Sequence, residues 1–218
     1  MKMNVIKIAA VTGLLLLAGQ QGNSQETFVN LDFESVIPFP PLDENGRVPI
    51  TNALPGWTGS INGNGVDRVY YDNVPLSGGP FITLVDSLTP FFKPIEGSYS
   101  VFLKSGTATG FIPAAIGQTG QIPSAALSLL FLMADPYLGV SFAGRPIPLV
   151  QFGTSGNYTV VGGDISMFAG QTGELLFIGT GFFDDIQFSN RPIPEPSTFC
   201  LFGLGALLLG LRFRCKRT

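Results

Sequence analysis

Short segments of alternating polarity, separated by turns rich in glycine and proline, constrain the fold of this chain more than any other feature. In residues 98–104, Tyr99, Val101 and Leu103 occupy every second position and would share one face of a strand. Residues 127–133 are apolar on both faces, which is typical of a central strand covered on each side. Helical periodicity is nearly absent. The pattern therefore predicts an all-β protein.

The same alternation predicts further strands between turn signals such as Asn-Gly-Asn-Gly at 62–65. About ten short strands at this spacing favour a β-sandwich. Both cysteines, Cys200 and Cys215, lie after the strands, so we expect the sandwich to fold without disulfides. The further predicted strands are 29–33, 66–71, 81–86, 138–142, 149–152, 158–161, 175–178 and 182–188.

A basic start followed by an apolar run marks the N-terminus as a secretory signal peptide. Lys2 and Lys7 precede the apolar residues 8–19, and this order is that of a cleavable signal. Small residues ahead of Gln25 predict cleavage before that residue, with cleavage a few residues earlier as the alternative. We therefore assign residues 1–24 to a signal peptide, which implies export by the general secretion machinery.

The C-terminal end combines a proline-rich segment, an apolar run and a basic end. Residues 199–211 carry no charge. As a helix, the run from Phe199 to Phe213 would span roughly 22 Å, which is short of the roughly 30 Å of a bilayer core. We therefore expect a single marginal transmembrane helix that is held in the membrane temporarily. The basic residues that favour a cytoplasmic C-terminus are Arg212, Arg214, Lys216 and Arg217.

Pro194, Glu195 and Pro196, followed by an apolar helix and a basic cluster, resemble the PEP-CTERM sorting signal of exported bacterial proteins. The resemblance covers residues 191–218. It implies that an exosortase, an integral membrane protease-transpeptidase, acts at the Pro-Glu-Pro motif. It also implies that the chain resides only transiently in the inner membrane before delivery to the cell surface or extracellular matrix. A permanent C-terminal anchor behind a proline-rich linker is the alternative.

A second resemblance covers most of residues 25–190. The segments 30–34, 55–57, 97–101 and 183–186 read Asn-Leu-Asp-Phe-Glu, Pro-Gly-Trp, Gly-Ser-Tyr-Ser-Val and Phe-Asp-Asp-Ile. In this order they are similar to the skeleton of galactose-binding-like domains. The resemblance implies a jelly-roll β-sandwich, which frequently holds a structural calcium ion and sometimes binds sugars.

Charge and composition exclude several functions for residues 25–196. This region contains all fifteen acidic residues and only six basic ones, for a net charge of −9. It would repel phosphate backbones, so we expect no nucleic-acid partner. It contains neither His nor Cys, which excludes Ser-His-Asp and Cys-His catalysis and the usual zinc sites. We expect no enzyme, and a glycosidase or lyase that uses paired carboxylates is the catalytic alternative.

Two carboxylates are candidate calcium ligands. Asp184 shares parity with Phe182, Ile186 and Phe188, so it points inward if those residues do. A buried carboxylate must be paired or hold a metal. Glu34 follows the first predicted strand and joins Asp184 if the first and last strands lie close together. The alternative is that Asp184 accepts hydrogen bonds from backbone N–H groups in a turn.

Aromatic residues are candidates for binding sugars. Trp57 follows Pro55 and Gly56, and its ring and those of Tyr70 and Tyr71 could stack on a sugar face. The alternative for Trp57 is burial under the loop after the first strand. Together the observations predict a non-catalytic surface or matrix protein, with a carbohydrate-binding module for exopolysaccharide as the second hypothesis.

Overall fold

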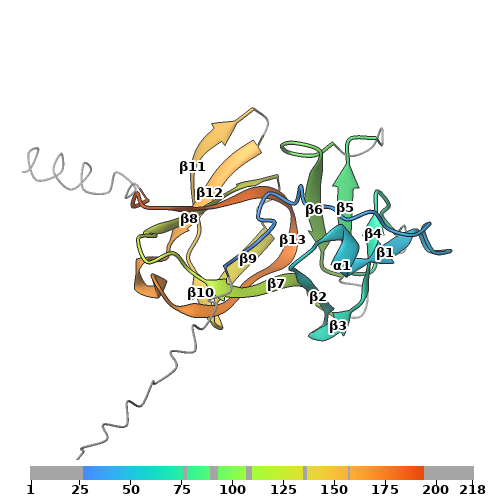
Figure 1. The fold of residues 1–218 in the computed structure, drawn as a ribbon, viewed down its shortest axis with the longest axis horizontal. Coiled ribbons are helices and arrows are strands. Elements are labelled where there is room, and N and C mark those ends of the chain that lie inside the picture. Colours follow the sequence, from blue (N-terminus) through green and yellow to red (C-terminus); the bar gives the residue numbers. More distant parts are fainter. Residues whose placement is uncertain are drawn as a thin grey trace, which may run out of the picture.

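The all-β prediction is confirmed by the computed structural model, which describes residues 27–193 except 76–77, 89–92, 107–109, 135–136 and 157. Within these residues there are thirteen strands, one short α-helix (α1, Ile50–Ala53) and one 3₁₀ turn (η1, Ser166–Phe168) (Figure 1). The predicted signal peptide, the Pro-Glu-Pro motif at 194–196, and the apolar and basic tail lie outside the described residues.

The strands follow one another with short connections. They are β1 (Arg47–Pro49), β2 (Thr58–Ile61), β3 (Asn64–Val66), β4 (Arg68–Tyr71), β5 (Phe81–Asp86), β6 (Tyr99–Lys104), β7 (Ala114–Gln121), β8 (Ser128–Met133), β9 (Tyr137–Phe142), β10 (Arg145–Ile147), β11 (Val150–Ser155), β12 (Tyr158–Asp164) and β13 (Thr172–Ser189).

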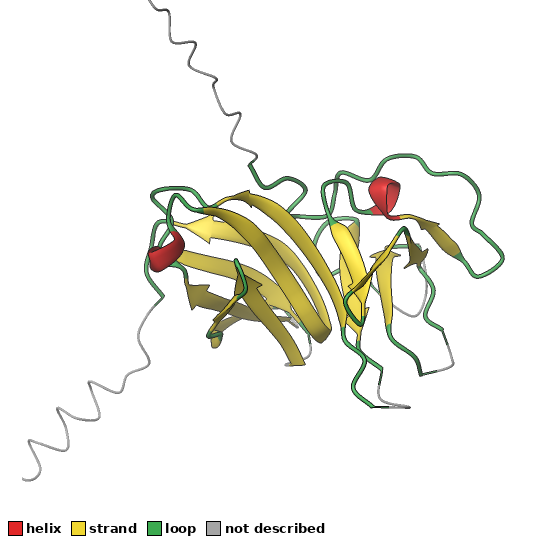
Figure 2. Ribbon diagram, turned by 90° about the horizontal axis from the view of Figure 1, so that it is seen from below, coloured by secondary structure: helices red, strands yellow, loops and turns green. Residues whose placement is uncertain are grey.

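The long strand β13 joins two halves of the sheet. Its first part pairs with β7 and β9, in the order β3-β2-β7-β13-β9-β10. Its last part pairs with β6 and β8, in the order β1-β4-β5-β6-β13-β8-β12-β11. Neighbouring strands are antiparallel except β4 and β5. Figure 2 shows the curved strands that wrap around the interior.

A glycine corner lets β13 change from one half to the other without ending. Gly179 has φ +128°, and a Cβ at this position would collide with the carbonyl oxygen of Tyr137. The Ser105 hydroxyl donates to the Gly179 carbonyl at 2.9 Å, and the Ser105 N–H donates to Thr180 Oγ1 at 3.0 Å. The predicted strands at 175–178 and 182–188 are therefore parts of one strand.

The core lies between the two halves and includes a cluster of packed aromatic rings. Phe177 and Phe183 come from opposite halves of β13, and their rings stack with centroids 4.8 Å apart. Phe131 of β8 packs edge-on against Phe177 at 5.5 Å. All three side chains are fully buried. Because each such ring removes a large apolar area from water, this cluster stabilises the contact between the halves.

The predicted strand at 29–33 is wrong. Only Thr27 forms a bridge, to Gln121, and the chain then turns through positive φ at Asn30 (51°) and Phe33 (56°). The Asn30 side chain accepts a hydrogen bond from the N–H of Ser35 at 2.8 Å, which competes with strand pairing. The sequence does alternate here, but the fully buried Phe33 reaches the core from a loop and not from a strand.

Candidate functional site: an acidic pocket

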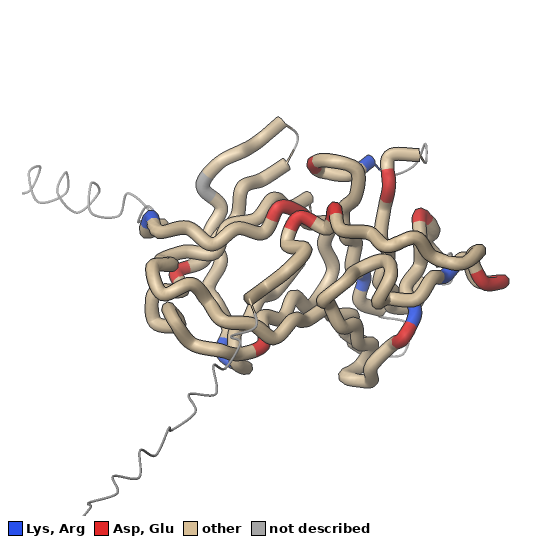
Figure 3. The backbone as a smooth tube through the Cα atoms, in the orientation of Figure 1, with Lys and Arg blue, Asp and Glu red and all other residues tan. Residues whose placement is uncertain are grey.

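Five acidic residues line one cavity of about 250 Å³, which we call the acidic pocket. Its lining residues come from the loop after Thr27, the loop before β6 and the last part of β13, and none of them is Lys or Arg. Figure 3 shows several acidic segments close together near the middle of the molecule. The lining residues are Asp32, Glu34, Glu96, Gly97, Asp184 and Asp185. The structure thus brings together the two predicted calcium ligands, Glu34 and Asp184.

Asp184 is the buried member of the acidic pocket, with 1% of its surface exposed. Its Oδ2 accepts from the Ser100 hydroxyl at 2.6 Å and from the N–H of Glu96 at 3.2 Å, and its Oδ1 accepts from the N–H of Asp185 at 2.7 Å. Burial raises the pKa of Asp184 to about 7, and the charge of Glu34 adds to the rise, while these hydrogen bonds oppose it. The carboxyl group therefore keeps its proton to a higher pH than an exposed aspartate does.

A bulge in β13 places the two adjacent aspartates. The pairing of β13 with β8 shifts between Asp184 and Gln187, and Asp185 has φ +49°. The N–H of Ile186 donates to the carbonyl of Leu31 at 3.0 Å, which ties the N-terminal loop to the bulge. The predicted inward position of Asp184 is confirmed, but the regular alternation behind it is not. Phe183, rather than Phe182, lies in the central core.

Glu34 holds the loop before β6. Its Oε1 accepts from the N–H groups of Ser98 at 2.7 Å and Tyr99 at 2.9 Å. Gly97 has φ +59°, and a Cβ there would collide with Glu34 Oε1. Only glycine can adopt this φ and leave room for Glu34 Oε1 without strain. The sequence pattern did not identify Glu96 and Gly97 as pocket residues, because they lie in a loop without periodicity.

The acidic pocket offers oxygen ligands but no preformed metal centre. Among the residues that the structure describes, no three acidic side chains are grouped closely enough to hold an ion. Asp184 already accepts backbone N–H bonds, as the alternative interpretation predicted. Oε1 of Glu34 is engaged as well. A calcium ion would therefore have to use other oxygens of these carboxylates, such as Glu34 Oε2, together with backbone carbonyl groups.

The three aromatic candidates for sugar binding do not form one surface. Trp57 is only 3% exposed, and its Nε1 donates to the carbonyl of Asn30 at 3.0 Å. Its ring therefore belongs to the core and is not accessible for stacking on a sugar, which corrects this part of the hypothesis. Tyr71 donates its hydroxyl to Asp86 and packs against Phe39. Tyr70 points to the opposite face of β4, because adjacent strand residues alternate.

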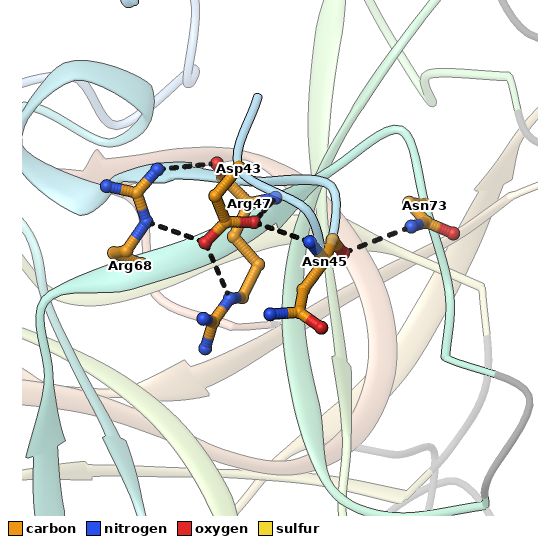
Figure 4. A network of polar contacts seen from close by, with 5 residues as sticks. All are labelled: Asp43, Asn45, Arg47, Arg68 and Asn73. Carbon is orange, nitrogen blue, oxygen red and sulfur yellow. Dashed lines mark hydrogen bonds and ion pairs between the residues drawn. The ribbon is translucent and has the colours of Figure 1, made fainter. Parts of the chain in front are cut away.

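Tyr70 lines a second cavity, which we call the arginine pocket. Arg47 of β1 and Arg68 of β4 also line it. Both guanidinium groups contact Asp43 (Figure 4). Strand parity alone puts Arg68 and Tyr70 on one face, but the approach of Arg47 depends on the pairing of β1 with β4, which the sequence does not reveal.

Comparisons with known proteins find one family match. Residues 192–217 match the model of the PEP-CTERM protein-sorting motif. None of the curated proteins matches the chain. Among solved structures, the arabinose-bound MgGH51 α-L-arabinofuranosidase aligns at 16% identity with a TM-score of 0.27, over 79% of this chain and 28% of that one. A likeness this low carries no argument about fold or activity.

The matched residues begin where the described domain ends. Within the described part of the chain, no helix is long and apolar enough to cross a membrane. The last described residues, 192 and 193, are the first two of the match. The chain therefore carries a PEP-CTERM protein-sorting motif at its C-terminal end.

Proposed function

We propose that the chain is the precursor of a non-catalytic surface or extracellular-matrix protein, whose β-domain is released from its sorting tail by an exosortase. The observation that carries the proposal is the PEP-CTERM motif at residues 192–217. In this proposal the signal peptide directs export and residues 199–213 hold the chain in the inner membrane until the tail is removed.

The end of the β-domain supports removal of the tail. The N–H of Leu127 donates to the Ser189 carbonyl at 2.8 Å, and the Ser128 hydroxyl donates to the Arg191 carbonyl at 2.7 Å. These bonds fasten the chain to β8 up to the residue before the motif. A cut at the Pro-Glu-Pro segment therefore leaves the domain's own hydrogen bonds intact.

A non-catalytic role agrees with the chemistry of the domain. The region 25–196 has no His or Cys, so the common nucleophile–base arrangements cannot form. We assign the domain to galactose-binding-like jelly rolls, in keeping with the sequence skeleton and the antiparallel strands. A glycosidase or lyase would require two carboxylates at a substrate cleft. In the acidic pocket, Asp184 and Glu34 instead accept hydrogen bonds from the loop before β6.

Replacing Pro194, Glu195 and Pro196 together by alanine tests the sorting proposal. We expect the variant to accumulate in the inner membrane, whereas the wild type reaches the cell surface. A matched control replaces Pro146 and Pro148, which occur in a second Arg-Pro-Ile-Pro sequence at 145–148 and are exposed. Equal surface delivery of the Pro-Glu-Pro variant and the wild type, measured by fractionation and immunoblotting, would overturn the proposal.

We also propose that the acidic pocket binds one structural calcium ion through Glu34 and Asp184. Five carboxylates line the pocket, and the pKa of Asp184 is raised by burial and by the charge of Glu34. A divalent cation would offset this mutual repulsion, and calcium prefers hard oxygen ligands. The ion would hold the N-terminal loop, the loop before β6 and the bulge of β13 together.

A further inference from the structure

The arginine pocket lies where the β2–β3 hairpin meets the edge formed by β1, β4 and β5. Its volume is about 160 Å³. Arg47, Arg68 and Tyr70 form its polar side, whereas Ile61 and Phe81 contribute to an apolar side. At roughly 30 Å³ per water molecule, the cavity has room for about five waters. It is therefore suited to a small ligand or to one unit of a polymer.

Hydrogen bonds hold the inner edge of each guanidinium group in the arginine pocket. Asp43 Oδ2 accepts from Arg47 Nε at 3.1 Å and from Arg68 Nε at 3.0 Å, and Arg68 Nη2 donates to the Arg47 carbonyl at 2.8 Å (Figure 4). A guanidinium has five N–H donors. Among the described residues, the Nη groups of Arg47 and Nη1 of Arg68 donate no hydrogen bond. These outer N–H groups are available to bind an anion.

Asp43 fixes the arginines without neutralising both of them. Its Oδ1 accepts from the N–H groups of Asn45 at 3.0 Å and Arg47 at 2.8 Å. Burial acts to raise the pKa of Asp43, but these backbone bonds and the charge and side-chain bond of Arg47 outweigh it and lower the pKa. Asp43 is therefore ionised at neutral pH. Two guanidinium groups and one carboxylate leave a net charge of +1 on an arrangement that is already in place.

The charge and shape of the arginine pocket select the ligand. One surplus positive charge, in a region with a net charge of −9, matches a monoanion better than a multiply charged phosphate. The outer N–H groups of two guanidinium groups can donate to the oxygens of a carboxylate. The ring of Tyr70 and the apolar side chains offer a surface for the C–H face of a sugar ring. A carboxylated sugar satisfies all three features.

We propose that the arginine pocket binds one hexuronate unit of an acidic polysaccharide. The carboxylate accepts hydrogen bonds from Arg47 and Arg68, and the sugar ring lies against Tyr70. The inference rests on the proposed extracellular role and deepens its second hypothesis, a carbohydrate-binding module for exopolysaccharide. Binding by the full chain in mild detergent tests it separately, since that measurement does not depend on removal of the tail.

The test compares galactose-series sugars that differ only at C6, together with D-glucuronate, which also differs at C4. The full chain, labelled with ¹⁵N, is titrated by NMR with D-galacturonate, D-glucuronate, D-galactose and D-galactose 6-phosphate. We expect saturable shifts near Arg68 and Tyr70 with at least one hexuronate, at an affinity at least tenfold higher than for galactose. Galactose 6-phosphate is expected to bind more weakly than the uronate. Equal or tighter binding of galactose or of the phosphate would overturn the assignment.

Variants locate the site. Arg68→Gln and Arg47→Gln are each expected to weaken uronate binding by about tenfold, whereas Arg145→Gln on the exposed strand β10 removes the same charge elsewhere and leaves it unchanged. Arg68→Lys keeps the charge but loses the fork, so it should also bind more weakly. The uronate affinity of Tyr70→Ala is compared with that of Tyr137→Ala, because Tyr137 is 76% exposed on β9. Thermal unfolding verifies that each variant is folded, and an equal loss in Arg145→Gln would refute the proposal.

Discussion

The acidic pocket and the arginine pocket use charge in opposite ways. In the arginine pocket, Asp43 lies between two guanidinium groups at 3.0 and 3.1 Å, and its pKa is lowered. In the acidic pocket, burial raises the pKa of Asp184 to about 7, and the charge of Glu34 adds to the rise. One cluster contains its own counter-charge. In the acidic pocket, the carboxylate of Asp184 has only N–H and O–H donors as partners, so a proton or a cation would stabilise this pocket more.

The largest expected effect comes from removing the buried carboxylate. Asp184→Ala leaves the Ser100 hydroxyl and the N–H groups of Glu96 and Asp185 without their acceptor. We expect a loss of about 2–5 kcal/mol in the free energy of unfolding, because buried donors without partners are costly. Asp43→Ala, in the half-buried network of Figure 4, should cost less. Chemical denaturation of both variants measures this, and the reverse order would contradict the comparison.

Calcium is expected to stabilise the acidic pocket alone. At a hundredfold excess over the dissociation constant, a ligand that binds only the folded state stabilises it by about 2.7 kcal/mol. Thermal unfolding in EDTA and in millimolar calcium measures the effect. Asp184→Asn should abolish the calcium-dependent rise in midpoint, whereas Arg68→Gln should retain it. If calcium does not change the unfolding midpoint of the wild type, Asp184 serves only as a hydrogen-bond acceptor for the loop before β6.

A pair of glycines isolates the contact between Glu34 and the loop before β6. Gly97→Ala and Gly63→Ala both place alanine at positive φ, which costs about 1–2 kcal/mol in each case. A Cβ at Gly97 also collides with Glu34 Oε1, whereas one at Gly63 meets nothing within 4 Å. We expect the Gly97 variant to be less stable by a further 1 kcal/mol or so. Equal losses of stability in the two variants would show that the Glu34 side chain moves aside at little energetic cost.

An effect of similar size is expected from the dependence of stability on pH. The pKa of Asp184 is about 7 in the folded protein against a model value of 3.8, so the folded state binds the proton more tightly. Stability from this group is therefore full below pH 4 and is lost as pH rises through 7. Between pH 6 and 8 the loss is about 1.4 kcal/mol. Asp184→Asn should remove this slope in calcium-free buffer, and an unchanged slope would assign it to other groups.

Alternation predicted the strands whose pairing is regular and missed those defined by distant partners. Residues 81–86 form β5 as predicted, and 127–133 and 138–142 agree with β8 and β9 to within one residue. Strand β7 was missed because its sequence, Ala-Ala-Ile-Gly-Gln-Thr-Gly-Gln, is rich in small and polar residues. It is a strand because it lies between β2 and β13.

The candidate site was predicted in part. Parity predicted that Asp184 points inward, although a bulge breaks the alternation on which that prediction rested. The approach of Glu34 was expected because the first and last segments were expected to be neighbours. The bulge at Asp184 and the left-handed turn at Phe33 could not be predicted, because alternation carries no information on contacts between distant segments such as the bond between Ile186 and Leu31. Trp57 carried two interpretations, and its bond to Asn30 decides for burial.

The intact mass of the protein recovered from the surface of its native host tests the central claim most directly. The account predicts a chain that begins near Gln25 and ends within or just after Pro194-Glu195-Pro196, with any added group visible as extra mass. It predicts that residues 199–218 are absent. A surface-exposed protein whose mass still includes those residues would contradict removal of the sorting tail.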